Sequence, residues 1–246
     1  MKNILLTIEY NGTNYSGWQK QEGVLTIQQT IENALKEICG CDVELFASGR
    51  TDAGVHAYAQ MANFTYNGNI PTEKIAFAIN SKLPDDIKVL KSVEVKDDFH
   101  ARFSAKRKTY LYKLYLSEQP LPLKEQNYLR IKYQFNLKSV RRAARYFVGT
   151  HDFAAFTTAI DKREKETTRK IFSVKVFKKP DNEVFIYVTG SGFLHNMVRI
   201  IVGTLLEVGY GKIKPSEIKQ IIAQKERKNA GATAAAKGLY LLKVYY

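Results

Sequence analysis

The sequence around position 52 reads Ser48-Gly49-Arg50-Thr51-Asp52-Ala53-Gly54-Val55-His56-Ala57. It lies between two runs of residues typical of strands, at 42–48 and 59–66. Asp52 therefore falls on a glycine-bounded turn between strands, a common way to present a reactive group. The alternative is an Asx-turn, in which the aspartate caps its own backbone. The tripeptide Thr-Asp-Ala alone favours the Asx-turn, whereas the rest of the chain favours a reactive carboxylate.

A helix before this turn is marked at both of its ends. Thr26 stands at its start, and Gln29 follows three residues later, at the spacing of a capping box. The apolar stripe of this helix is formed by Ile27, Ile31, Leu35 and Ile38. Gly40 follows the stripe and predicts the end of the helix.

The order of the remaining elements predicts an α+β fold. Residues 1–100 also contain expected strands at 4–10 and 87–95 and a helix at 71–83. The second half restates this order with expected strands at 105–117, 171–179, 183–190 and up to 246, and helices at 137–149, 195–208 and 215–224. This repeated order of elements predicts two related α/β-sandwich domains, 1–103 and 104–246, with mainly antiparallel sheets joined across a central cleft.

The charge of the chain is concentrated in its second half. Residues 1–100 contain 9 Lys and Arg against 13 Asp and Glu, whereas residues 101–246 contain 29 against 11. The halves thus carry −4 and +18 of the net +14. Such asymmetry favours a polyanionic partner, nucleic acid before a membrane, although ribosome-associated and heparin-binding proteins share it. The mixed charges at 161–166 are expected to form a solvated loop.

Composition indicates a reduced, cytoplasmic protein without metal or cofactor. Cys39 and Cys41 are too close in sequence for an ordinary disulfide, and the four histidines show no metal-ligand spacing. The longest apolar run, 197–206, is interrupted by Arg199 and Gly203, so no membrane span is expected. Because Met1 leads straight into a predicted strand, no leader segment is expected.

Arg199 lies in a predicted helix among apolar neighbours. A buried guanidinium needs a partner, because an unpaired buried charge costs several kcal/mol. Gly203 stands one turn further along the same face and leaves room beside Arg199 for another segment of chain. We expect Asp52 to be the partner, which would keep its carboxylate ionised; a structural ion pair with another acid is the alternative.

Tyr110 is the third candidate in the sequence. It follows Lys108 in a predicted strand, where its ring is able to stack on a base and present a hydroxyl to it. Aromatic residues are common in strands, so Tyr110 alone favours an ordinary strand position.

Two basic clusters are candidates for phosphate contact. The helix at 137–149 carries Lys138, Arg141, Arg142 and Arg145 on one side without acids. Like charges at i, i+4 spacing destabilise a helix by a few tenths of a kcal/mol, a cost that a phosphate backbone would reverse. The second cluster precedes Tyr110 and consists of Arg102, Lys106, Arg107 and Lys108.

One carboxylate, one buried arginine and one tyrosine form a sparse catalytic set. The sequence lacks the His-x-Glu and Cys-x-x-Cys pattern of zinc deaminases and an obvious second carboxylate for glycosidase chemistry. A lone aspartate is still able to attack a sugar or base carbon of a nucleotide and leave again. That chemistry is an isomerisation, and it needs no cofactor.

Five blocks of the sequence resemble the TruA family of tRNA pseudouridine synthases over nearly the whole chain. The active-site signature of that family is highly specific and corresponds here to Gly49–His56. The other four blocks are Ile8–Gln19, Phe99–Ala105 with Tyr110, Gly192–Arg199 and Gly238–Leu241. One departure is the run of alanines at 232–236, where relatives usually carry prolines; we expect it to touch no catalytic group.

The resemblance implies conversion of uridine to pseudouridine at positions 38, 39 and 40 of the tRNA anticodon stem-loop. Asp52 would be the nucleophile, and Arg50 would help to extrude or replace the flipped uridine. Tyr110 would stack on the uracil and assist proton removal from C5, and Arg199 would pair with Asp52. The resemblance also implies a homodimer in which one tRNA touches both subunits.

The sequence leaves some alternatives open. A catalytically inactive RNA-binding protein would not need the complete set of Arg50, Asp52, Tyr110 and Arg199. A nucleoside hydrolase that uses Asp52 would not need the strongly basic second half. The residues also leave open whether Asp52 attacks C1′ of the ribose or C6 of the base, or acts mainly as a base. His56 and His195 are expected to be structural.

Overall fold

The computed structural model describes residues 1–132, 134–158 and 166–246, which form two compact units. Unit 1 contains residues 1–106 and 240–246, and unit 2 contains residues 107–239. The division thus falls three residues after the expected boundary, and the last seven residues return to unit 1. Of the charged run expected to form a solvated loop, residues 161–165 lie outside the described part of the chain.

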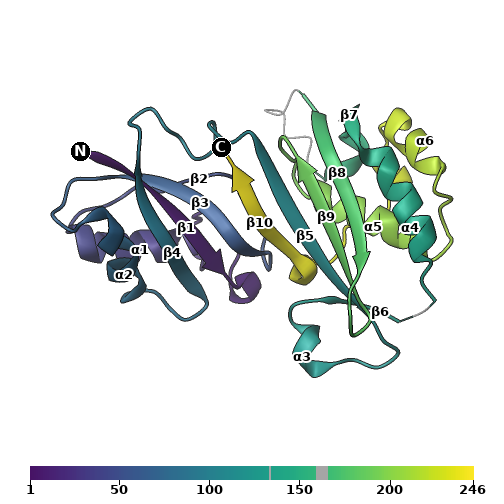
Figure 1. The fold of residues 1–246 in the computed structure, drawn as a ribbon, viewed down its shortest axis with the longest axis horizontal. Coiled ribbons are helices and arrows are strands. Elements are labelled where there is room, and N and C mark those ends of the chain that lie inside the picture. Colours follow the sequence, from purple (N-terminus) through teal and green to yellow (C-terminus); the bar gives the residue numbers. More distant parts are fainter. Residues whose placement is uncertain (133, 159–165) are drawn as a thin grey trace. The chain divides into compact units, whose positions relative to one another are not determined.

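The sheet of unit 1 has the strand order β4-β1-β3-β10 (Figure 1). Strand β1 (Lys2–Tyr10) is antiparallel to β3 (His56–Tyr66) and to β4 (Ile87–Val95). Strand β10 (Leu239–Tyr245) is parallel to β3, and the short β2 (Phe46–Ala47) is antiparallel to it. The strand expected at 4–10 is confirmed, and its Ile4, Leu6 and Ile8 are fully buried.

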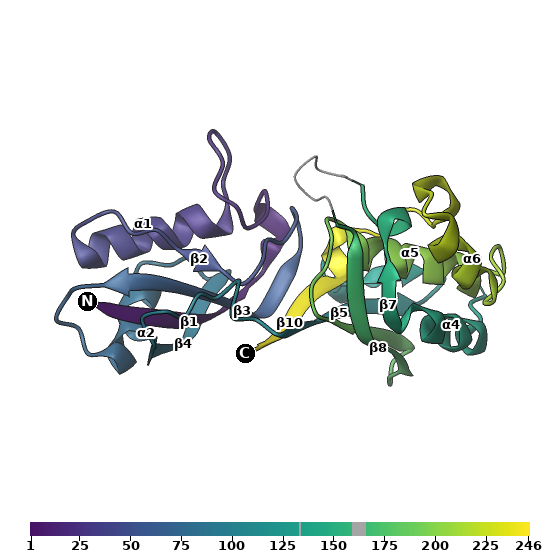
Figure 2. The same ribbon diagram turned by 90° about the horizontal axis from the view of Figure 1, so that it is seen from above.

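Two helices cover this sheet (Figure 2). Helix α1 (Ile27–Cys39) begins and ends as predicted: the Thr26 hydroxyl accepts a hydrogen bond from the Gln29 amide at 3.4 Å, and Gly40 has a φ of 70°. Helix α2 (Thr72–Asn80) packs on β4 and contacts α1. A single 3-10 turn, η1 (Gly12–Asn14), follows β1.

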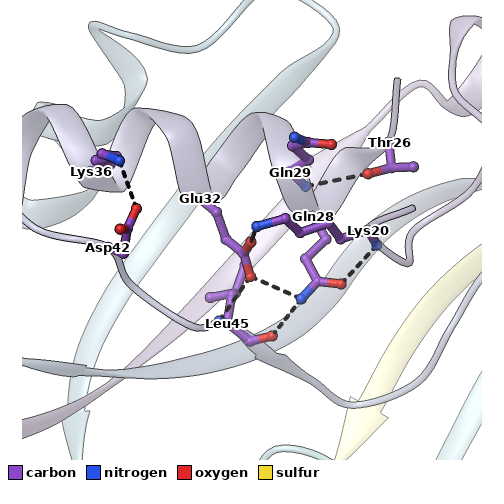
Figure 3. Close-up of polar contacts among 8 residues, drawn as sticks. All are labelled: Lys20, Thr26, Gln28, Gln29, Glu32, Lys36, Asp42 and Leu45. Carbon is purple, nitrogen blue, oxygen red and sulfur yellow. Dashed lines mark hydrogen bonds and ion pairs between the residues drawn. The ribbon is translucent and has the colours of Figure 1, made fainter. Parts of the chain in front are cut away.

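A buried carboxylate attaches α1 to the chain just before the Asp52 turn (Figure 3). Glu32 accepts hydrogen bonds from the Leu45 amide at 3.2 Å and from the Gln28 side chain at 2.9 Å, and it forms a 3.2 Å ion pair with Lys20. The Gln28 side chain also donates to the Leu45 carbonyl oxygen at 3.2 Å. Helix α1 therefore fixes the backbone seven residues before Asp52.

The sheet of unit 2 has the strand order β5-β9-β8-β7, and these four strands pair antiparallel. These strands are β5 (Arg107–Leu116), β7 (Gly149–Asp152), β8 (Thr168–Lys178) and β9 (Glu183–Gly190). The short β6 (Leu129–Ile131) runs parallel to β5. Strands β8 and β9, expected at 171–179 and 183–190, are joined by a hairpin turn in which Asp181 and Asn182 have φ values of 57° and 56°.

The longer helices of unit 2 lie on one face of its sheet (Figures 1 and 2). They are α4 (Leu137–Ala144), α5 (Met197–Gly209) and α6 (Glu217–Gln224), and α4 contacts both α5 and β8. The shorter elements are α3 (Pro122–Glu125) and the 3-10 turns η2 (Arg145–Phe147), η3 (Ala154–Phe156), η4 (Arg227–Asn229) and η5 (Ala236–Gly238).

The helix expected at 137–149 is shorter than predicted. Its α-helical part ends at Ala144 and continues as the η2 turn, and Gly149, with a φ of 128°, then begins strand β7. Of the residues expected to face inward, Val140, Ala144 and Phe147 are buried, whereas Leu137 is half-buried. The α+β class with mainly antiparallel sheets is confirmed.

Candidate active site

Asp52 lies on a turn of unit 1 between β2 and β3. The Val55 amide donates to the Asp52 carbonyl oxygen at 3.1 Å, and Gly54 has a φ of 75°, which favours glycine. Backbone hydrogen bonding therefore closes this turn. The Asp52 side chain is half-buried, and Arg50 next to it is exposed.

The chain on the N-terminal side of Asp52 is held from three directions. The hydroxyls of Thr51 and Tyr10 lie 2.7 Å apart, and the Trp18 amide donates to the Thr51 carbonyl oxygen at 3.0 Å. The Gln60 side chain donates to the Gly49 carbonyl oxygen at 2.9 Å. These contacts come from three parts of unit 1, so the position of the Asp52 backbone is determined by the fold rather than by the turn alone.

Position 17 requires glycine because its backbone lies close to the backbone of Thr51. With a φ of 91°, Gly17 adopts a conformation that other residues rarely adopt, and a Cβ atom there would lie 2.6 Å from the Thr51 carbonyl oxygen. Residues Tyr15 to Trp18 of the block Ile8–Gln19 therefore pack directly against the Asp52 turn, and this packing requires glycine at position 17.

His56 is a buried residue immediately after this turn. Its Nδ1 accepts a hydrogen bond from the Gly12 amide at 3.1 Å, and its ring stacks on Tyr240 with 4.6 Å between the ring centroids. An accepting Nδ1 carries no proton, so this hydrogen bond favours the neutral imidazole. These contacts connect the turn to β10 at the end of the chain.

Tyr110 lies in β5 of unit 2 and is 8% exposed. Its ring meets Phe193 edge-on, with 5.2 Å between centroids and a 90° angle between the ring planes. Phe193 belongs to the block Gly192–Arg199, so the block that contains Arg199 also packs against the ring of Tyr110. That contact could have been suspected from the aromatic residue in Gly192-Phe193 but was not predicted.

Arg199 projects from the first turn of α5 and is half-buried. Its Nη1 donates to the Asn196 side-chain oxygen at 2.7 Å, and its Nε donates to the Ala234 carbonyl oxygen at 2.8 Å. Asn196 begins the helix in the left-handed conformation, with a φ of 60°. Two acceptors therefore orient the guanidinium: the side chain of Asn196, just before α5, and the backbone of Ala234, 35 residues later in the sequence.

The expectation that Gly203 admits another chain segment beside Arg199 is confirmed. A Cβ atom on Gly203 would lie 1.7 Å from the Ala232 carbonyl oxygen. The same segment corrects the expectation that the alanine run touches no catalytic candidate, because Ala234 is the residue that accepts from Arg199. The sequence could not predict this contact. The acceptor is a backbone carbonyl oxygen, which every residue type has.

The basic candidates are mostly on the surface. Arg102, Lys106 and Arg107 are exposed, and Lys108 is half-buried. The four basic residues of the α4 segment are exposed as expected, and a surface hollow is lined by Lys138, Ser139, Arg141, Arg142 and Arg145. The Arg141 Nε donates to the Val176 carbonyl oxygen at 3.0 Å, so this side chain is attached to β8.

The candidates belong to the two units as follows. Unit 1 carries Arg50, Asp52, Arg102 and Lys106, and unit 2 carries Arg107, Lys108, Tyr110, Arg199 and the α4 cluster. The pairing of Asp52 with Arg199 joins different units and stays a prediction. Within the described ranges, no group of three His, Cys, Asp or Glu residues is placed to hold a metal ion. No helix in that part of the chain is long and apolar enough to span a bilayer.

Comparison with known proteins defines the class of this chain. The family model described as tRNA pseudouridine synthase matches residues 6–104 and 143–246. The chain therefore belongs to the tRNA pseudouridine synthase family, and the expected class of RNA-modifying isomerase is confirmed at that level.

Individual relatives cover the whole chain. A protein of Acetivibrio thermocellus named tRNA pseudouridine synthase A is 49% identical over 246 residues, with 100% of both chains covered. Proteins of the same name from Ruminiclostridium cellulolyticum and Caldicellulosiruptor bescii are 47% and 48% identical, again with 100% of both chains covered. These identities extend the match across residues 105–142, which the family model leaves out.

Proposed function

We propose that this chain converts uridine to pseudouridine at positions 38, 39 and 40 of the tRNA anticodon stem-loop. The family assignment supports the reaction class. The observation that carries the role of Asp52 is its turn, where the fold holds the neighbouring backbone through Tyr10, Trp18 and Gln60. A catalytic group has to be held in this way to react efficiently.

The proposed reaction is balanced without a cofactor. The C1′–N1 bond of uridine breaks and a C1′–C5 bond forms, the hydrogen on C5 leaves as a proton, and N1 gains a proton. Asp52 attacks and is released unchanged, whether the attack occurs on the sugar or on the base. Tyr110 stacks on the uracil and assists removal of the C5 proton, Arg50 helps to extrude the base, and Arg199 pairs with the Asp52 carboxylate.

Access to a paired uridine requires that the base leave the stack, at a cost of a few kcal/mol. We propose that phosphate contacts offset this cost. The contributing residues are Arg102, Lys106, Arg107, Lys108, Arg141, Arg142 and Arg145. A footprint made mainly on the phosphate backbone reads little sequence, which would let one site serve several neighbouring uridines.

We further propose that the chain acts in the cytoplasm as a homodimer whose two copies both touch one tRNA. Residues 1–103 would carry the Asp52 turn, and residues 104–246 would supply the basic surface. Sedimentation of the purified protein tests the assembly, since a dimer has twice the 28.0 kDa mass of one chain.

A tritium-release assay tests the proposed reaction. The substrates are tRNA transcripts with tritium at uracil C5 and a single uridine at position 38, 39 or 40, with a transcript that has cytidine at all three positions as the control. We expect tritium release from the three uridine transcripts without loss of base. Release of free uracil would identify a hydrolase, and tight binding without either product would identify an RNA-binding protein without this activity.

A further inference from the structure

Residues 230–235 form an extended segment along α5, which we call the strap. Several of its backbone groups are hydrogen-bonded to other parts of unit 2. The strap connects η4 to η5 and leads into β10. It coincides with most of the alanine-rich departure noted in the sequence. Because the methyl side chains of its alanines form no hydrogen bonds, its position depends mainly on the groups that its backbone meets.

The first fastening is a close approach between the strap and α5. A Cβ atom on Gly231 would lie 2.6 Å from the Gly203 carbonyl carbon, just as one on Gly203 would overlap Ala232. The Gly231 amide donates to the Thr204 hydroxyl at 2.9 Å, and that hydroxyl donates to the Ile200 carbonyl oxygen at 2.8 Å. Two glycines and one threonine therefore bring the strap into direct contact with the helix that carries Arg199.

Arg227 provides the second fastening. Its Nη1 donates to the Gly231 carbonyl oxygen at 2.9 Å and to that of Ala230 at 3.3 Å, and its Nη2 donates to the Thr233 hydroxyl at 3.3 Å. The planar guanidinium is suited to this role, because its donors are arranged in a fixed fork.

Arg199 and Ala234 of the strap each donate a hydrogen bond to the other. The Arg199 Nε donates to the Ala234 carbonyl oxygen at 2.8 Å, and the Ala234 amide donates to the Arg199 carbonyl oxygen at 3.1 Å. The position of the guanidinium is thus coupled to the position of one residue of the strap.

Tyr112 holds the next residue. Its hydroxyl donates to the Ala235 carbonyl oxygen at 2.6 Å, and its ring is fully buried in β5 on the same strand face as Tyr110. Burial raises the pKa of Tyr112 far above 10, an effect that the charge of Arg199 partly opposes, so the hydroxyl stays a donor. Tyr112 therefore connects the strand of Tyr110 to the strap that holds Arg199.

We propose that Tyr112, acting through the strap, is a positioning residue that sets the guanidinium of Arg199 for the reaction. Tyr112 acts by holding the Ala235 carbonyl oxygen, and through it the adjoining Ala234 carbonyl oxygen that receives the Arg199 Nε. Misplacement by about an ångström costs a reaction far more than it costs binding, so the effect falls on kcat. This inference rests on the proposed function, in which Arg199 acts with Asp52.

Tyr115→Phe is the matched control for Tyr112→Phe. Both tyrosines are fully buried in β5, and both use their hydroxyls; that of Tyr115 bonds the Glu125 side chain and the Leu121 amide, neither of which belongs to the strap. We expect both variants to lower the unfolding midpoint, because each loses a buried hydrogen bond. Only Tyr112→Phe is expected to lower kcat in the tritium-release assay, by about tenfold, with KM for tRNA unchanged.

A second comparison tests whether the effect of Tyr112 on kcat depends on Arg199. In an Arg199→Lys background, Tyr112→Phe is expected to cause no further loss of kcat, because lysine lacks the Nε that bonds Ala234. In ¹⁵N-labelled protein without tRNA, we expect the Nε–H signal of Arg199 to exchange faster with water in Tyr112→Phe than in Tyr115→Phe.

The inference is overturned if the two tyrosine variants lose kcat equally, if the losses of Tyr112→Phe and Arg199→Lys multiply, or if the exchange of the Arg199 signal is unchanged. Its failure is distinct from failure of the proposed function, in which the unmodified protein itself releases no tritium.

Discussion

The hydroxyls of Tyr10 and Thr51 lie 2.7 Å apart inside unit 1, one residue before Asp52. Tyr10 ends β1, so this contact connects the central strand of the sheet to the candidate nucleophile's turn. Burial raises the pKa of Tyr10 far above its usual value of 10.0, against the smaller opposite effect of its hydrogen bonds with Thr51 and Gln60. The phenol therefore keeps its proton in the folded chain.

This raised pKa predicts loss of stability in alkali. Above pH 10 the unfolded chain releases the Tyr10 proton while the folded chain retains it, so the contribution is complete below pH 10 and falls as pH rises. Each pH unit above 10 costs about 1.4 kcal/mol for one such group. Urea unfolding at increasing pH is expected to show a shallower decline in Tyr10→Phe than in the unmodified protein, and equal slopes would contradict the prediction.

Gly17→Ala is expected to disturb the Asp52 turn. The new Cβ atom would lie 2.6 Å from the Thr51 carbonyl oxygen, in addition to the cost of a positive φ of about 1 kcal/mol. Gly23→Ala is the control, since Gly23 has a φ of 75° and a Cβ atom there would have no other atom within 4 Å. Gly17→Ala should lower both the unfolding free energy and kcat more than Gly23→Ala. Identical effects would show that the close approach to Thr51 is unimportant.

Glu32→Ala is expected to weaken the attachment of α1 to the chain before Asp52. Alanine removes the Oε1 atom that accepts from both the Leu45 amide and the Gln28 side chain, so buried donors lose a partner, at a cost of about 1–3 kcal/mol. Glu37→Ala, which removes an exposed ion pair with Lys82, should cost at most about 1 kcal/mol. Urea unfolding of both variants measures the difference, and a Glu32 variant as stable as the Glu37 variant would refute it.

Removal of Arg141, Arg142 and Arg145 together is expected to weaken tRNA binding and to flatten its salt dependence. Each phosphate contact contributes about 0.7–0.9 to the slope of log affinity against log salt, so the slope should fall by roughly 2–3. The control replaces Lys74, Lys91 and Lys96, three exposed lysines of unit 1, by alanine. Equal slopes for the arginine variant and the unmodified protein would exclude the α4 segment from the interface.

The sequence predicted elements well where local signals agree. Helix α1 was predicted at both ends because Thr26 and Gly40 act through neighbouring backbone groups. Strands β4 and β9 match their expected bounds. The end of α4 was predicted too late, because η2 keeps Phe147 buried while it already leaves the α-helical path.

The candidate site was less predictable than the fold, because its supports are distant in sequence. The contact of Gly12 with His56 depends on how β1 and β3 pair, and that of Arg199 with Ala234 on a backbone carbonyl 35 residues away. The return of residues 240–246 to unit 1 likewise depends on pairing of β10 with β3, which no local pattern reveals. Motif spacing can identify reactive groups, whereas packing decides what holds them.

Tritium release by Asp52→Asn tests the central claim most directly. Asparagine keeps the size of the side chain but cannot act as a carboxylate nucleophile, so we expect kcat to fall by roughly 10³-fold or more while tRNA binding and the unfolding midpoint stay unchanged. Asp42→Asn, at an exposed ion pair of unit 1, should release tritium at the rate of the unmodified protein. Full turnover by Asp52→Asn would contradict the account.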